Sequence, residues 1–279
     1  MIDDAGTPPA SLDPDPRVRL IRRASSGGAG AARNVGLSVA RGEWVAFLDA
    51  DDHWYPERLE AFAYEVVSGH VGLQDALTSD LLVHQPDGSE WLWSSRHPFS
   101  TEDQFRTQIR RPFLTVMFAI RREYLVELGG FDEQLVEGED ADVLVRLLLR
   151  GGKVHFINRA LATYNLGIGK SADKERLFGA QVTGLDKLLA LELSAVQRQA
   201  VQTRRTQMVR SHHKARRARI LKGLAEGVGE RKELISVLRA GELGFASTLI
   251  VAAGTISPRF SRLIARTKRR MGFGSRQNT

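Results

Sequence analysis

Residues 44–52 read Trp-Val-Ala-Phe-Leu-Asp-Ala-Asp-Asp, an apolar run that ends in three carboxylates. A continuous apolar run of this kind is typical of a strand buried on both faces of a parallel sheet. Before it, residues 18–21 suggest a short strand, residues 25–30 a glycine-rich turn and residues 31–40 a helix. After it, Pro56 opens another helical segment. This alternation of short strands, turns and helices predicts an α/β fold.

The chain changes character after about residue 170. Strand patterns give way to helical ones over residues 173–226, with Leu and Ala faces and basic stripes. Residues 1–170 carry 18 Lys and Arg against 25 Asp and Glu, whereas residues 171–279 carry 22 against 8. We therefore predict an α/β domain at 1–170 and a basic, all-helical C-terminal region at 171–279.

Composition excludes several classes of protein. The 279 residues include no cysteine, which rules out disulfide scaffolds, Cys-ligated zinc, iron–sulfur clusters and cysteine nucleophiles. The apolar run at residues 245–256 is shorter than the ~20 residues that span a bilayer. The acidic start of the chain lacks the basic and apolar regions of a secretory signal. We expect a cytoplasmic protein.

The carboxylates at the end of residues 44–52 form the first candidate site. Asp49, Asp51 and Asp52 follow a predicted strand, at the edge where open α/β sheets bind ligands. Mg²⁺ and Mn²⁺ prefer carboxylate oxygens and bridge phosphate oxygens. An EF-hand loop that begins at Asp49 is rejected, because its sixth position needs glycine and is Trp54. A solvated acidic loop that caps the next helix is the alternative.

The glycine-rich turn forms the second candidate site. Gly28 and Gly30 follow a predicted strand and open a helix, and Asp49 ends the next strand, which imitates a dinucleotide-binding fingerprint. Arg33 stands where the third glycine of that fingerprint would allow close packing of helix and strand. An NAD-binding oxidoreductase is therefore a weaker alternative, and a flexible turn before a helix is another.

The third candidate site begins at a turn, Gly130-Phe131-Asp132-Glu133, and continues into a predicted helix that starts near Asp140. Glu139 and Asp140 are adjacent carboxylates at the start of that helix. A carboxylate in this place can act as a general base where it meets a hydroxyl. Alternatively, the acidic residues only interact favourably with the helix dipole.

In this order and spacing, the motifs resemble those of family 2 glycosyltransferases, which have the GT-A fold. The resemblance rests on Ala32-Arg33-Asn34, Gly42-Glu43-Trp44, Asp49-Ala50-Asp51-Asp52, Gly129-Gly130-Phe131-Asp132-Glu133, and Glu139-Asp140 with Arg146. It covers roughly residues 1–170 and implies a Rossmann-like mixed sheet flanked by helices. The first strand and helix of the family pattern have no counterpart in this sequence, so we expect an N-terminally truncated GT-A domain.

The resemblance implies a metal-dependent, inverting hexosyltransferase of polysaccharide synthesis. It would move a sugar from a nucleoside-diphosphate donor, a UDP-sugar foremost, to a hydroxyl-bearing glycan or lipid-linked acceptor. Asp51 and Asp52 would hold Mn²⁺ or Mg²⁺ on the donor diphosphate. Asp140 would be the base that deprotonates the acceptor, with Glu139 beside it. The residues implied to contact the nucleotide-sugar are Asp4, Gly30, Arg33, Asn34, Asp49 and Asp51.

The basic C-terminal region allows a further expectation. Residues 259–270 alternate cations with apolar residues, which suits peripheral contact with an anionic membrane at its inner face. A solvated basic face is the alternative, and nucleic-acid binding has only charge in its favour. The alternative to an enzyme is a catalytically inactive, truncated GT-A protein that acts as a basic interaction module.

Overall fold

The computed structural model describes residues 1–166 and 173–226. The described residues within 1–173 and 180–206 form one compact unit, and those within 174–179 and 207–226 belong to a second. Every candidate site residue lies in the first unit. The boundary at residue 170 stays a prediction.

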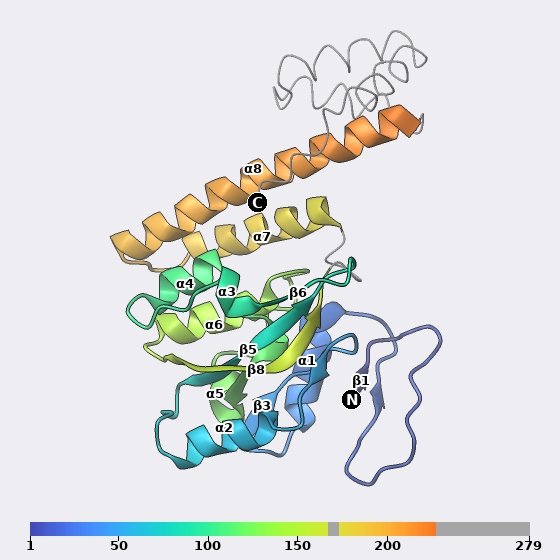
Figure 1. The fold of residues 1–279 in the computed structure, drawn as a ribbon, viewed down its shortest axis with the longest axis vertical. Helices are drawn as coiled ribbons and strands as arrows, with labels where there is room; N and C mark the ends of the chain where they lie inside the picture. The colour runs from blue at the N-terminus through green and yellow to red at the C-terminus, as the bar shows by residue number, and fades with distance from the viewer. Residues whose placement is uncertain (167–172, 227–279) are drawn as a thin grey trace. The chain divides into compact units, whose positions relative to one another are not determined.

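The first unit is built on a six-stranded mixed sheet (Figure 1). Its strands lie in the order β3 (Trp44–Ala46), β7 (Phe118–Arg121), β5 (Ala76–His84), β8 (Val154–Asn165) and β4 (His53–Trp54), and β6 (Glu90–Leu92) pairs with β5. Within this sheet β5 and β8 pair in parallel, and the other pairs are antiparallel. The predicted α/β class is confirmed.

The expectation of a parallel strand at residues 44–48 is wrong. β3 ends at Ala46, and in the described chain its one strand partner is β7, which runs antiparallel to it. Val45 and Phe47 are buried in the core, whereas Leu48 is 49% exposed. The apolar run thus reflects alternate burial on an edge strand followed by an exposed leucine.

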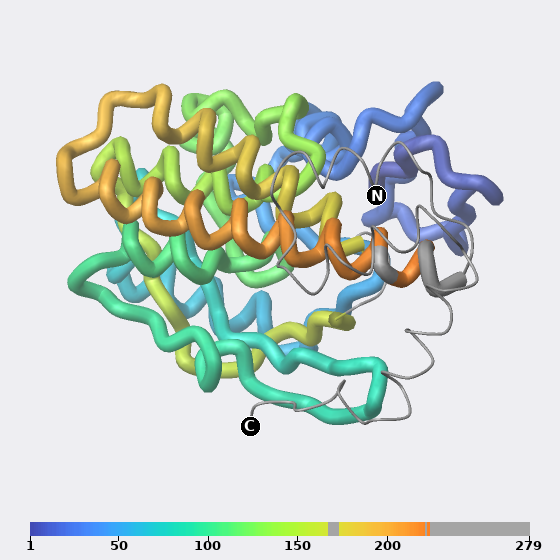
Figure 2. Tube along the Cα trace, turned by 90° about the horizontal axis from the view of Figure 1, so that it is seen from above, coloured from blue at the N-terminus to red at the C-terminus, as the bar shows by residue number. Residues whose placement is uncertain are grey.

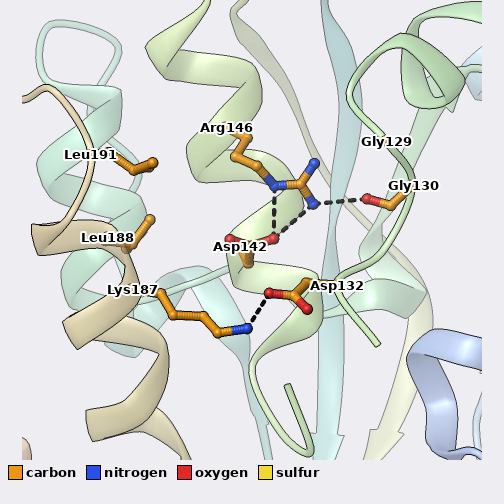
Figure 3. Close-up of a pocket in the computed structure, with 8 residues that line it drawn as sticks. All are labelled: Gly129, Gly130, Asp132, Asp142, Arg146, Lys187, Leu188 and Leu191. Carbon is orange, nitrogen blue, oxygen red and sulfur yellow. Dashed lines mark hydrogen bonds and ion pairs between the residues drawn. The ribbon is translucent and has the colours of Figure 1, made fainter. Parts of the chain in front are cut away.

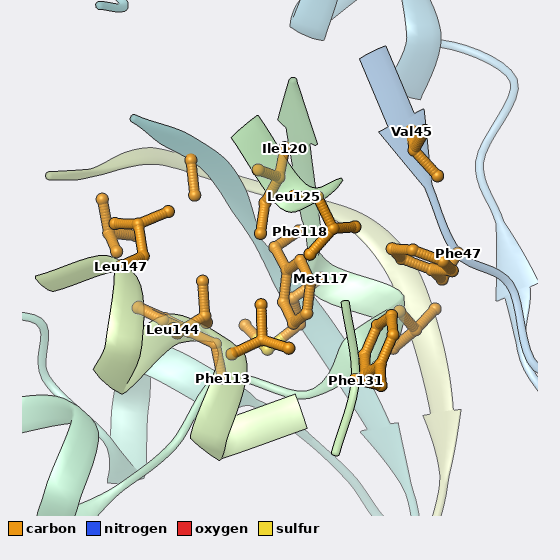
Figure 4. Close-up of a cluster of buried hydrophobic side chains, with 14 of the residues drawn as sticks. Val45, Phe47, Phe113, Met117, Phe118, Ile120, Leu125, Phe131, Leu144 and Leu147 are labelled. Atoms are coloured by element: carbon orange, nitrogen blue, oxygen red, sulfur yellow. The ribbon is translucent and has the colours of Figure 1, made fainter. Parts of the chain in front are cut away.

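Alternate residues of the sheet enter two hydrophobic clusters, because successive side chains of a strand point to opposite faces. The larger cluster includes Ala76, Phe118, Ile120 and Val154 of the sheet with Val143, Leu144 and Leu147 of α6 (Glu139–Leu149). Figure 4 shows this cluster around Met117 and Phe118. The smaller one joins Leu77, Ala119 and Leu161 to Phe62 of α2 (Arg58–Val67). α6 and α2 accordingly lie on opposite sides of the sheet in Figure 1.

The remaining helices connect these strands or follow them. They are α1 (Gly28–Val39), α3 (Trp93–Arg96), α4 (Gln104–Arg110), the 3₁₀ turn η1 (Thr115–Met117), α5 (Arg122–Glu127), α7 (Lys174–Leu189) and α8 (Ala195–Glu226). α7 and α8 confirm the helices predicted over residues 173–226. The segment 259–270, predicted to contact a membrane, lies outside the described residues. Across residues 1–166 and 173–226, no helix combines the length and apolar character needed to span a membrane.

The N-terminal segment forms a separate two-stranded sheet. β1 (Ile2–Asp3) pairs in parallel with β2 (Ile21–Arg22). β1 also contacts α1, and Figure 2 shows this segment in dark blue beside the first helix. The segment thereby brings Asp4, the residue after β1, to the start of α1.

Candidate active site

Arg33 of α1 joins the three candidate motifs at one guanidinium. One terminal nitrogen donates to both carboxylate oxygens of Asp49, at 2.8 Å each, and the other donates to Glu139 Oε1 at 2.5 Å. The side chain of Arg33 is only 11% exposed, and that of Glu139 is 9% exposed. The glycine-rich turn, the acidic segment and the start of α6 therefore meet, although Arg33 and Glu139 are 106 positions apart.

Asp140 lies beside this network in the first turn of α6. Its Oδ2 accepts a hydrogen bond from the Thr115 hydroxyl at 3.4 Å, and its Oδ1 accepts one from the Ala141 backbone N–H at 2.7 Å. Burial, together with the negative charge of Glu139, raises the pKa of Asp140 to about 7. A carboxylate with a pKa near neutrality can take a proton from a hydroxyl at physiological pH.

Asp51 and Asp52 lie in the turn between β3 and β4. Asp51 is exposed, and its backbone carbonyl accepts a hydrogen bond from Asn165 Nδ2 at 2.5 Å. Asp52 Oδ1 is buried and has no hydrogen-bond partner among the described residues. Burial and the charges of Asp49 and Asp51 raise the pKa of Asp52 to about 7. This turn thus concentrates three carboxylates, and burial together with their mutual repulsion disfavours the charged form of Asp52.

The carboxylate oxygens of Asp51 and Asp52 fit a hard divalent cation, because a buried carboxylate that accepts no hydrogen bond is stabilised most by a metal ion. The fit is partial. In the described chain, no three His, Asp or Glu side chains gather closely enough to bind a metal ion by themselves. Both oxygens of Asp49 already accept hydrogen bonds from Arg33, which leaves the carboxylates of Asp51 and Asp52 as the available metal ligands.

Asp4 caps the start of α1. Its carboxylate accepts hydrogen bonds from the backbone N–H groups of Gly27 and Gly28, from the Ser26 hydroxyl at 2.7 Å, and from Arg23. Burial alone would raise the pKa of Asp4, but these hydrogen bonds lower it overall. In a dinucleotide-binding protein these amides would receive the pyrophosphate. Here a carboxylate of the chain itself fills that place, which counts against the NAD alternative.

Asn34 and Gly30 contact the turn at residues 129–133. The Asn34 side-chain oxygen accepts a hydrogen bond from the Phe131 N–H at 2.8 Å, and its amide donates to the Phe131 carbonyl at 2.9 Å. A Cβ at Gly30 would lie 3.5 Å from the Asp132 carbonyl oxygen. Contact of Asn34 and Gly30 with a nucleotide-sugar stays a prediction. In the structure they hold the turn that leads to α6.

The opposite side of this turn is held by charged side chains around a pocket (Figure 3). Lys187 Nζ lies 2.6 Å from Asp132 Oδ2. Arg146 donates to Asp142 and, at 2.7 Å, to the Gly130 carbonyl. The turn that precedes Glu139 and Asp140 is therefore fixed from both sides.

We expect Gly130→Ala to disturb the site much more than Gly129→Ala. Both glycines have a positive φ, 68° at Gly130 and 88° at Gly129, so an alanine at either position costs about 1–2 kcal/mol of backbone strain. Only at Gly130 would the new Cβ lie 2.5 Å from Asn34 Oδ1, which breaks the contact to Phe131 and costs a further ~1–3 kcal/mol. Urea unfolding of both variants measures the difference. Equal losses of stability would contradict this role of Asn34.

The structure thus brings together Arg33, Asp49, Glu139 and Asp140, and it places Asp4, Gly30 and Asn34 in supporting contacts. The sequence analysis missed two residues of the site, Thr115 and Asn165. Neither stands in a recognisable motif, and each was brought to its partner by chain segments distant in sequence. No pattern along the chain could have indicated them.

Comparison with known proteins agrees with these motifs. The family model described as Glycosyl transferase family 2 matches residues 9–129, so the match ends before Glu139. The succinoglycan biosynthesis protein ExoO of Rhizobium meliloti is 34% identical over 152 residues, which are 50% of this chain and 42% of that protein. The putative teichuronic acid biosynthesis glycosyltransferase TuaG of Bacillus subtilis is 26% identical over 161 residues, covering 54% of this chain and 58% of that protein. The matches span about half the length of these relatives.

Among solved structures, S. aureus TarS 1-349 superposes with a TM-score of 0.52 at 16% identity. The superposition covers 91% of this chain and 74% of that chain. At this identity the likeness concerns the fold, which is a mixed sheet flanked by helices in the GT-A arrangement. Residues 9–129 therefore resemble glycosyltransferase family 2, and the unit that carries the candidate site has the GT-A fold.

Proposed function

We propose that this protein transfers a sugar, with inversion, from a nucleoside-diphosphate donor to a hydroxyl of a glycan acceptor in polysaccharide synthesis. One observation carries the proposal: Asp140, with its pKa raised to about 7, adjoins the network in which Arg33 joins Glu139 to Asp49. The names of the relatives ExoO and TuaG, from succinoglycan and teichuronic acid biosynthesis, support a polysaccharide product. The family resemblance favours a UDP-sugar as the donor.

In this proposal Asp140 takes the proton of the acceptor hydroxyl as that oxygen attacks the anomeric carbon. Attack from the side opposite to the departing diphosphate inverts the anomeric configuration. Thr115 and the Ala141 backbone N–H each donate to one oxygen of Asp140, which fixes the carboxylate while each oxygen keeps a lone pair that can take the acceptor proton. Arg33 fixes Glu139 next to this base and prevents it from turning away.

Asp51 and Asp52 are the residues that would hold Mn²⁺ or Mg²⁺. When bound, such an ion neutralises negative charge on the leaving diphosphate. Asn165 fixes the backbone of Asp51, which limits the freedom of the turn that carries both carboxylates. Arg33 restrains Asp49 at the start of the same turn.

Calorimetric titration with UDP and GDP, each with Mn²⁺ or EDTA, tests this assignment. We expect Mn²⁺-dependent binding of one nucleotide, weakened about tenfold or more in Asp52→Asn, a loss of roughly 1.4 kcal/mol or more. Asp13→Asn is the matched control, because Asp13 is an exposed carboxylate outside the site. Binding that is unchanged by EDTA and by Asp52→Asn would contradict the metal assignment. Binding of NAD alone would contradict the glycosyltransferase proposal.

A further inference from the structure

An aromatic stack lies outside the candidate site, on the β5–β6 hairpin and α3. The ring centroids of Trp93 and His97 are 4.0 Å apart, with the planes at 20°. Those of Trp91 and Trp93 are 6.0 Å apart, at 15°. The guanidinium carbon of Arg96 lies 4.2 Å from the centroid of the Trp91 ring. Neither indole N–H has a hydrogen-bond partner among the described residues.

Two further arginines lie near this stack. Arg110 ends α4 and Arg111 follows it directly. The ring of Phe99 lies 5.6 Å from that of Phe113, so the residues after His97 run alongside those after Arg111. Arg111 and Arg96 both act electrostatically on His97, and with burial as the main cause they lower its pKa. The stack therefore has at least two cations near it, Arg96 and Arg111.

Arg204 of α8 completes the group. Burial, together with the positive charges of Arg111 and Arg110, lowers the pKa of Arg204. Its neighbour Arg205 forms an ion pair with Asp186. Across the residues that the structure describes, the side chains of Arg96, Arg110, Arg111 and Arg204 form no ion pair and no hydrogen bond. Arg96, Arg110 and Arg111 are exposed and Arg204 is half-buried, so water screens their mutual repulsion, and this concentration of positive charge still attracts an anion.

We propose that these four arginines and the Trp91–Trp93–His97 stack bind an anionic segment of the acceptor glycan. The guanidinium fork matches a carboxylate or phosphate in two hydrogen bonds. The stacked rings of Trp91, Trp93 and His97 face one another, so their part is to hold Arg96, whose guanidinium carbon lies 4.2 Å from the centroid of the Trp91 ring. This inference rests on the proposed function. We call the seven residues the arginine–tryptophan patch.

The patch lies within reach of the proposed base. Arg111 is four residues from Thr115, whose hydroxyl donates to Asp140, and four extended residues span at most about 14 Å. Trp91 of β6 lies opposite Val83 of β5 in the sheet. Val83 belongs to the same core cluster as Val143 and Leu144 of α6, the helix that carries Asp140. One glycan chain could therefore contact the patch while its hydroxyl end meets Asp140. This proximity to the proposed base favours an acceptor glycan over a nucleic acid.

Binding of defined polymers to the full chain, without donor, tests the inference. The probes are a hyaluronan oligosaccharide for carboxylate, a glycerol-phosphate oligomer for phosphate, neutral dextran and single-stranded DNA. We expect one of the two acidic probes to bind and to change tryptophan fluorescence, and dextran not to bind. Whichever acidic probe binds more tightly identifies the anion. Equal binding of dextran, or binding of DNA but of neither acidic probe, would overturn the inference.

Substitutions locate the binding surface. Arg204→Gln and the double variant Arg110→Gln/Arg111→Gln should each weaken binding of the acidic probe by about tenfold. Arg205→Gln is the matched control, since it removes one charge from the same helix and should change binding less than about twofold. Equal effects of Arg204→Gln and Arg205→Gln would overturn the patch. If UDP still binds in a Mn²⁺-dependent way in that case, the patch fails while the proposed function stands.

Discussion

Asp140→Asn is expected to reduce sugar transfer by about 10²–10⁴-fold while donor binding persists. Asparagine has nearly the same shape, so it can still contact Thr115 and the Ala141 backbone N–H. It cannot accept a proton from the acceptor hydroxyl. Initial rates with a UDP-sugar, together with calorimetric binding of UDP, separate the loss of catalysis from a loss of binding.

Glu127→Gln is the matched control for this substitution, because Glu127 is an exposed carboxylate at the end of α5. Its rate should equal that of the wild type. Transfer that survives Asp140→Asn at the wild-type rate would rule out Asp140 as the base. Loss of both transfer and UDP binding would instead mean that the substitution disrupts the site.

The pH dependence of the wild-type rate is a second measurement, which reports on Asp140 together with Asp52, because the pKa of each is raised to about 7. The pKa of Asp140 is raised to about 7, so the residue is protonated and inactive as a base well below pH 7. The rate should therefore rise as the pH passes through about 7. A rate that is constant from pH 5.5 to 8.5 would contradict the assignment.

The order of the motifs along the chain was enough to predict the fold class, because each motif has a distinct local pattern. Pairing between strands was not predictable in the same way. The run at residues 44–48 looks the same whether its partner is parallel or antiparallel, and only the structure identifies β7 as that partner. Alternation of buried Val45 and Phe47 with exposed Leu48 becomes visible only when the core is known.

The sequence was also limited in assigning roles within the site. It indicated Asp4 as a candidate by family resemblance, yet the hydrogen bonds of Asp4 run to the start of α1. Capping of this kind depends on a carboxylate more than 20 positions before the helix, which no local pattern reveals. Thr115 escaped notice because a single threonine carries no signal until a partner such as Asp140 is placed next to it.

Arg33→Met is expected to have the largest effect on stability, a loss of about 3 kcal/mol in the free energy of unfolding. Methionine has a similar length but no charge. It therefore leaves the Glu139 side chain, which is only 9% exposed, without its counter-charge and beside a second carboxylate, Asp140. Asp49 is 42% exposed, so water compensates part of its loss. Urea unfolding measures the effect. Arg17→Met is the matched control, because the Arg17 side chain is 87% exposed and its pair with Asp15 contributes less than about 1 kcal/mol.

A second substitution distinguishes the cause of this loss. If the cost of Arg33→Met comes from a buried carboxylate left without its partner, then Glu139→Gln in the same chain removes that charge and restores part of the stability. If the cost comes from lost packing of the arginine on Phe131, whose ring centroid lies 5.5 Å from the guanidinium carbon, the double variant is no more stable than the single one. Arg33→Met that unfolds as readily as Arg17→Met would show that the guanidinium does not hold the three motifs together. Restored stability would instead mean that the chain keeps Glu139 charged at a cost that Arg33 offsets, as expected of a carboxylate retained for catalysis.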